Sequence, residues 1–220
     1  MHISFLHTAD VHVETFDRLF EKLDNSIELT HRVEPNLLSR ARDEGLEAVR
    51  DDTLGILRDL SVADAVVCTC STLGPLADDI SQSIGHVFRI DRPVMESACK
   101  DGENILVAIC LESTRDATLA LLTQCAAQLG RNISPQIVLC QEAWPFFETG
   151  DIASFAAEIA KAVKTEISRR PKTDCIVLAQ ASMRVAEGLL RSVDVPVRSS
   201  PLLAVERSIE IARAQVARQS

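Results

Sequence analysis

Two stretches of the sequence, ADAVVCTCSTL (63–73) and TDCIVLAQASM (173–183), decide the fold, because the second repeats the pattern of the first 110 residues later. Each stretch is a short continuous apolar run that starts after an aspartate and ends in small polar residues. Such a run, bounded by turn signals, is typical of a strand in a parallel sheet whose two faces are both covered. The pair therefore predicts two equivalent strands in two equivalent halves of the chain.

Three further pairs of apolar runs extend this repeat. They are HISFLH (2–7) with NILVAI (104–109), IELTHRV (27–33) with QIVLCQE (136–142), and VFRIDRP (87–93) with VPVRSSP (195–201). Because the offsets are nearly constant, one four-strand unit is written twice. Stretches with helical periodicity lie between the runs, at 38–59, 75–83, 115–129, 151–169, 183–191 and 202–218.

The predicted fold is α/β, with two pseudo-symmetric lobes that are each a four-stranded parallel sheet flanked by helices. We expect residues 1–95 to form the first lobe, completed by a C-terminal helix over 201–220, and residues 96–200 to form the second. Open α/β sheets bind ligands beyond the carboxyl ends of their strands. An active site is therefore expected in the cleft between the lobes.

Composition excludes several classes of function. The 220 residues carry a net charge of −9 and no lysine- or arginine-rich run, which argues against nucleic acid and anionic membranes as partners. No apolar run is long enough to span a bilayer, and the N-terminal MHISFLHTAD lacks the features of a signal peptide. The seven cysteines are odd in number and lie mostly in apolar runs, and none has a zinc-site spacing. We expect a cytoplasmic protein without a structural metal.

Cys70 is the first candidate for chemistry, because it ends a predicted strand and precedes a predicted helix. The positive end of a helix dipole and its free N–H groups can lower the pKa of a thiol towards neutrality. The backbone amides of Ser71 and Thr72 would then also be available to an oxyanion or a carboxylate. The alternative is a buried thiol that only packs, as most of the other cysteines are expected to do.

The segment VVCTCSTLG (66–74) resembles the Cys-(Asn/Ser)-Thr motif of the aspartate/glutamate racemase superfamily, which includes hydantoin racemases, maleate isomerases and arylmalonate decarboxylases. Three other segments resemble that family in order: RIDRPVMESA (89–98), ILVAICLEST (105–114) and SSPLLAVERSIEIA (199–212). The resemblance covers almost the whole chain. It implies two pseudo-symmetric α/β lobes, an active site between them and no cofactor.

The chain departs from this family at the second catalytic position. The racemases have a second cysteine there, in a Gly-Cys-Thr motif, and the two thiols exchange the substrate α-proton from opposite sides. Here Gln180 and Ala181 take the places of the thiol and the threonine. An amide does not exchange a proton near neutral pH, so a two-thiol racemisation is excluded. Cys110 also replaces the first threonine of the carboxylate loop, whereas Thr114 keeps the second.

The remaining candidates follow from the resemblance and from their positions at strand ends. Cys70 is the expected base or nucleophile, Gln180 a hydrogen-bond donor opposite it, and His7 a proton donor, since imidazole titrates near neutral pH. The hydroxyls expected to bind substrate carboxylate or carbonyl groups are those of Thr8, Ser71, Thr72, Thr114 and Ser182. Local capping is the alternative for each hydroxyl, and a structural role is the alternative for His7.

Two hypotheses about function follow. The first is a cofactor-independent, single-cysteine enzyme that acts on a small carboxylic acid or a close derivative by isomerase, racemase-like or decarboxylase chemistry, through an enolate or a thiol adduct. The second is a catalytically inactive homologue that binds such a ligand on the same scaffold. The sequence leaves open the substrate, the reaction within the family, and whether the chain forms a homo-oligomer.

Overall fold

The computed structural model describes residues 1–219, which form two compact units. Unit 1 comprises Met1–Asp91 together with the segment from Pro201 onward, and unit 2 comprises Arg92–Ser200. The first boundary thus falls after Asp91 rather than after residue 95. The physical reason is that helix α5 (Arg92–Asp101) packs against elements of unit 2, namely helix α6 and strands β7 and β8.

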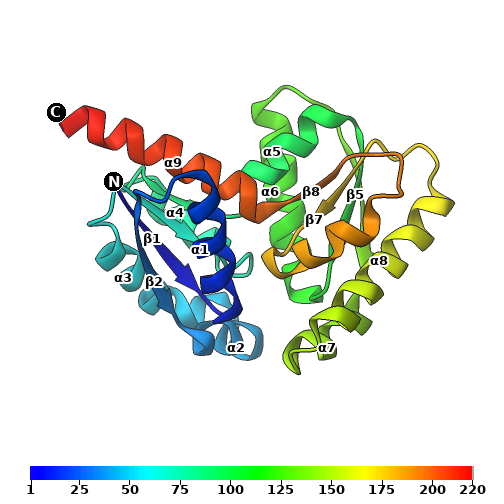
Figure 1. Ribbon diagram of the computed structural model, residues 1–220, viewed down its shortest axis with the longest axis horizontal. Helices are drawn as coiled ribbons and strands as arrows, with labels where there is room; N and C mark the ends of the chain where they lie inside the picture. Colours follow the sequence, from blue (N-terminus) through cyan, green and yellow to red (C-terminus); the bar gives the residue numbers. More distant parts are fainter. Residues whose placement is uncertain (220) are drawn as a thin grey trace. The chain divides into compact units, whose positions relative to one another are not determined.

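Unit 1 is a parallel sheet with the strand order β2-β1-β3-β4 (Figure 1). Its elements are β1 (His2–His7), α1 (Val11–Leu23), β2 (Glu28–Val33), α2 (Pro35–Glu44), the 3-10 turn η1 (Leu46–Val49), α3 (Arg50–Leu60), β3 (Ala65–Cys68), α4 (Gly74–Ser81), β4 (Val87–Arg89) and the closing helix α9 (Ser200–Gln219). The two sheet faces follow from the alternation of side chains along each strand. Leu6, Val66 and Cys68 belong to a core cluster with residues of α2, α3 and α4. Phe5, on the other face, packs against Phe16 and Phe20 of α1, in a tilted and an edge-to-face arrangement respectively.

Unit 2 repeats this topology, with the strand order β6-β5-β7-β8. Its elements are α5, β5 (Asn104–Ile109), η2 (Glu112–Thr114), α6 (Arg115–Gln128), β6 (Ser134–Leu139), η3 (Gln141–Ala143), α7 (Trp144–Glu148), α8 (Ile152–Arg169), β7 (Cys175–Leu178), η4 (Ala181–Leu190) and β8 (Val197–Ser199). Helix α8 and turn η4 cover one sheet face and share a core cluster with Leu106, Ala108 and Leu178. Helix α5 covers the other face (Figure 1). There the Cys175 thiol contacts the carbonyl of Ala98.

The structure confirms the α/β class and the two four-stranded parallel sheets. It differs from the predicted elements in detail. The helix predicted over 38–59 is two helices, because Gly45 adopts φ +93 and ends α2. Helices α1 and α5 were not assigned from the sequence, and the helix predicted over 183–191 is the 3-10 segment η4. No helix within residues 1–219 is long and apolar enough to cross a membrane.

Candidate active site

Cys70 lies in the turn between β3 and α4, at the carboxyl end of the sheet of unit 1. Strand β3 ends at Cys68 and helix α4 begins at Gly74, so the thiol precedes the helix by a full turn. All seven cysteines are buried and none forms a disulfide, but Cys70, at 7% exposed, is the most accessible of them. The thiol is therefore nearly hidden, yet it is placed where a ligand of this sheet would bind.

The surroundings of Cys70 keep its thiol protonated at neutral pH. Burial raises the pKa of the Cys70 thiol, and hydrogen bonds from the Thr8 hydroxyl, the Leu73 and Thr72 backbone N–H groups and the Thr72 hydroxyl oppose this rise without cancelling it. The expectation that the helix dipole would lower this pKa is therefore wrong, because the cost of desolvating the thiolate is the larger effect. The same donors are placed to stabilise a thiolate once a proton has left.

Thr8 and Thr72 lie against the Cys70 sulfur, whereas the other candidate hydroxyl groups have different surroundings. The Thr72 amide, expected to be available to an oxyanion, is engaged with Cys70. Ser71 is buried in the same turn. In unit 2, Thr114 is buried and its hydroxyl donates to the Leu111 carbonyl at 2.7 Å, a local bond that is not a helix cap, since its side chain accepts no N–H of α6. Ser182 is half-buried at the start of η4.

His7 does not share the surroundings of Cys70. Its side chain follows Phe5 on the α1 face of the sheet, stacked near Phe16 and His12, whereas Cys70 belongs to the core cluster on the opposite face. Burial first, and then the neighbouring His12 and His31, lower the pKa of His7 to about 3. His7 is therefore neutral at neutral pH, and it reaches the Cys70 turn only through Thr69.

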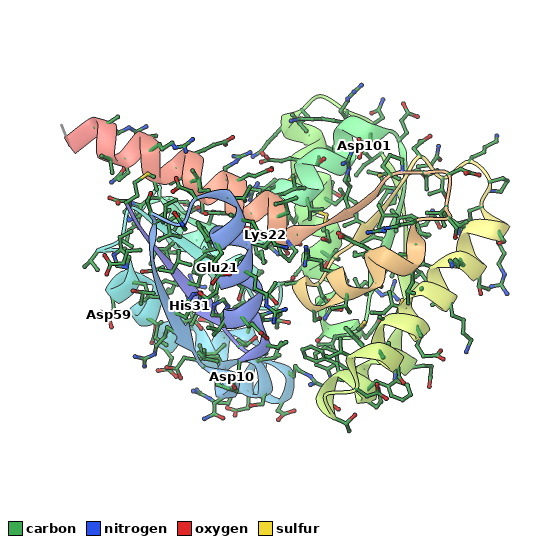
Figure 2. All side chains as sticks on the ribbon, viewed as in Figure 1. Asp10, Glu21, Lys22, His31, Asp59 and Asp101 are labelled. Carbon is green, nitrogen blue, oxygen red and sulfur yellow. The ribbon has the colours of Figure 1, made fainter. Side chains whose placement is uncertain are left out.

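A chain of hydrogen bonds runs from Thr69 through His7 and His31 to the surface. His7 Nδ1 lies 2.8 Å from Thr69 Oγ1, His7 Nε2 lies 2.8 Å from His31 Nδ1, and His31 Nε2 lies 3.1 Å from Asp17 Oδ1. His31 is labelled in Figure 2, on β2. Thr69 Oγ1 donates its own proton to the Leu6 carbonyl at 3.0 Å, so His7 Nδ1 donates to Thr69, and the Nε2 of neutral His7 accepts from His31 Nδ1. This arrangement explains His7 as a structural residue of unit 1.

Gln180 occupies in unit 2 the position that Cys70 occupies in unit 1. Cys68 pairs with Leu6 and Leu178 pairs with Ala108, and each candidate lies two residues beyond its strand. The Gln180 Oε1 accepts a short hydrogen bond from the Cys110 backbone N–H. Because a backbone N–H can only donate, this bond fixes the amide orientation and leaves the Nε2 protons for another acceptor. Gln180 is thus an anchored hydrogen-bond donor.

Sequence reasoning missed Arg89, whose guanidinium lies against residues 71–74, the turn that follows Cys70. Its side chain is 3% exposed and forms two hydrogen bonds to Asp91, at 2.6 and 2.8 Å, and one to Asp78 at 3.0 Å. Burial opposes its charge, but the two carboxylates outweigh burial and raise the pKa of Arg89. The sequence does contain a signal for this pair. Arg89 and Asp91 are opposite charges two residues apart in the apolar run VFRID (87–91), and residues at that spacing in an extended chain point to the same side.

No cluster of three or more histidine, cysteine, aspartate or glutamate side chains suited to a metal ion occurs among the residues that the structure describes.

Several solved structures match this two-unit chain over nearly its whole length. An aspartate racemase from Picrophilus torridus matches with a TM-score of 0.70 and 16% identity, over 96% of this chain and 94% of that one. A glutamate racemase from Bacillus anthracis matches with a TM-score of 0.73 and 15% identity, over 96% and 82%. An arylmalonate decarboxylase matches with a TM-score of 0.61 and 13% identity, over 96% and 92%. The chain has the fold of the aspartate and glutamate racemases.

All of these matches have low sequence identity. An allantoin racemase from Pseudomonas fluorescens also has this racemase fold. No family model matches the sequence, and no curated protein matches it. The fold therefore follows from structure, and the chemistry has to be argued from the residues at the strand ends.

Proposed function

We propose that the protein is a cofactor-independent enzyme in which the Cys70 thiol donates a proton to a carbanion or enolate formed from a small carboxylic acid. The observation that carries the proposal is a buried thiol with a raised pKa at the carboxyl end of the sheet, with the hydroxyl groups of Thr8 and Thr72 against it. A thiol that is protonated at neutral pH is an acid, and donors already aimed at its sulfur stabilise the thiolate that it becomes.

Decarboxylation is the reaction that suits this arrangement best. Loss of carbon dioxide from a malonate-type acid leaves an electron pair on the α-carbon, delocalised as an enolate. The Cys70 proton is transferred to that carbon, and the thiolate then regains a proton from water. No base is needed to begin this reaction, which fits a protonated resting thiol.

The amide of Gln180 supports a reaction in which a single group, the Cys70 thiol, delivers the proton. This amide is far too weak an acid and too weak a base to transfer a proton near neutral pH, so the position equivalent to Cys70 holds no second proton-transfer group. We propose that its anchored Nε2 donates a hydrogen bond to a carboxylate or enolate oxygen. The matching structures include proteins named for aspartate, glutamate and arylmalonate, all of them small carboxylates, which supports this class of substrate.

The experiment is a screen of small α-substituted malonates in deuterated water, followed by NMR of the product α-carbon. The expected result is incorporation of one deuteron in a single configuration. Cys70→Ser should abolish this turnover, because a serine hydroxyl is a far weaker acid and leaves an alkoxide. Cys68→Ala, which removes a buried thiol two residues away, is the matched control and should keep it.

Two results would contradict the proposal. Turnover by Cys70→Ser at the wild-type rate would remove Cys70 from the chemistry. Tight binding of small dicarboxylates without any turnover would favour the inactive ligand-binding protein. A specific observation supports that second candidate: Thr114 and the Gln180 oxygen already satisfy backbone groups of their own unit.

A further inference from the structure

A buried ion cluster lies directly beneath the turn that carries Cys70. Arg89 and Asp91 are both almost fully buried, and their two parallel hydrogen bonds form the bidentate pair that a guanidinium makes with a carboxylate. Asp78 of helix α4 binds the third nitrogen of the same guanidinium at 3.0 Å. The cluster therefore links the end of β4 to the middle of α4, on either side of the turn.

The guanidinium also contacts the turn itself. Arg89 Nη2 lies 3.5 Å from the Ser71 carbonyl oxygen. At Gly74, a Cβ atom would lie 2.5 Å from the guanidinium carbon, so no larger residue fits there without displacing one of them. Arg89 thus lies against the backbone of residues 71–74, in which Leu73 N–H donates to the Cys70 carbonyl at 3.1 Å and Thr72 contacts the Cys70 thiol.

We infer that Arg89, oriented by Asp91 and Asp78, is a positioning residue that holds the 71–74 turn closed over Cys70, and that Gly74 is present because the guanidinium requires the space. The inference rests on the proposed role of Cys70 as a proton donor. The proton-donor role depends on burial of the thiol. We infer that the Arg89–Asp91–Asp78 cluster maintains this burial through its contact with residues 71–74.

Loosening the turn of residues 71–74 should make the Cys70 thiol more reactive towards alkylating reagents. Desolvation is the largest influence on this thiol, so exposure to water lowers its pKa towards the ordinary value and opens the sulfur to reagents. Both changes accelerate alkylation near neutral pH. Turnover should fall at the same time, because the donors for the thiolate are no longer fixed.

The experiment compares Arg89→Lys and Asp91→Asn with the wild type. Lysine keeps the charge but cannot bind Asp91, Asp78 and the turn together. Alkylation of Cys70 by iodoacetamide, followed by mass spectrometry as a function of pH, should be faster near neutral pH in both variants, by about tenfold for each unit by which the pKa of the thiol falls. The inflection of the profile should move to lower pH in both variants.

Arg198→Lys is the matched control. Arg198 forms the same kind of two-bond pair with Asp101 at 2.8 and 3.0 Å, within unit 2 (Asp101 is labelled in Figure 2). This variant should lower thermal stability without moving the Cys70 profile. A merely structural role for Arg89 would likewise lower stability and leave the profile of the folded variant unchanged.

Gly74→Ala provides a second route to the same change, since its methyl group pushes the turn off the guanidinium without touching any charge. Profiles of Arg89→Lys, Asp91→Asn and Gly74→Ala that overlay the wild type, in protein that is folded by circular dichroism, would overturn the inference. That outcome is distinct from failure of the proposed function, which is read from substrate turnover by the wild type and Cys70→Ser.

Discussion

Single residues set the chemistry of this chain, and Cys70 illustrates how position and environment act against each other. Its place before a helix favours the thiolate, whereas its burial favours the thiol, and burial is the stronger of the two. We expect Cys70 to alkylate before the other six cysteines, because they are at most 3% exposed, but more slowly than a free thiol at neutral pH. Peptide mass spectrometry after timed alkylation checks this order. A faster reaction at Cys140, the next most exposed, would contradict it.

Gln180 offers a second prediction at this scale. Gln180→Cys should not produce an efficient racemase of aspartate or glutamate. The resemblance to the racemase motifs implies that Ala181 and Cys110 stand where hydroxyl residues are usual, and a proton-transfer group contributes roughly 10²–10⁴-fold only within hydrogen-bond reach of its proton. Polarimetry of either amino acid with the variant measures the result. Rapid racemisation would show that the missing thiol is the only missing part.

At the scale of elements, the first strand of each unit begins with the same contact, a hydrogen bond from its backbone N–H to an aspartate carboxylate. The Asp64 carboxylate accepts the His2 backbone N–H at 2.8 Å, and Asp174 accepts the Glu103 and Asn104 N–H groups at 2.9 and 2.7 Å. In each unit, the residue before β3 or β7 thus fastens the start of β1 or β5. This shared contact is the local reason why the two aspartates appear at equivalent places in the repeated stretches.

We expect Asp174→Ala to lower the free energy of unfolding by about 1–3 kcal/mol, and Asp64→Ala by about 1 kcal/mol, because each loses hydrogen bonds from backbone donors to a charged acceptor. Chemical denaturation measures both. Asp59→Ala, at an exposed position near the end of α3 (labelled in Figure 2), should change stability little and is the control. Equal effects at all three positions would contradict the shared role.

At the scale of the whole molecule, neutral buried histidines make stability depend on pH. Burial lowers the pKa of His7 to about 3 and that of His12 to about 4, while an unfolded histidine titrates near 6.5. Between these values the unfolded chain binds protons that the folded chain does not, so stability is complete above about pH 7 and falls as the pH falls. Each residue should cost on the order of 2 kcal/mol by pH 5.

Denaturant midpoints measured from pH 8 to pH 4.5 test this dependence. His12→Gln should flatten the slope below pH 6.5, since one of the two titrating groups is gone. His86→Gln is the comparison, because it removes a half-buried histidine that binds the Ser61 carbonyl at 3.0 Å and is separate from His7 and His12. An unchanged slope in His12→Gln would show that the acid sensitivity has another origin.

The sequence by itself determined the strand pattern, the duplication and the equivalence of Cys70 with Gln180. Those features depend on apolar runs and their spacing, which are local and repeat along the chain. Only the tertiary structure decided which side chains share an environment. It separated His7 from Cys70 across the sheet, placed the Arg89–Asp91 pair beneath the thiol, and reversed the expected pKa shift of Cys70. Burial and opposing charge depend on residues distant in the sequence, so neither can be read from the residues that flank Cys70.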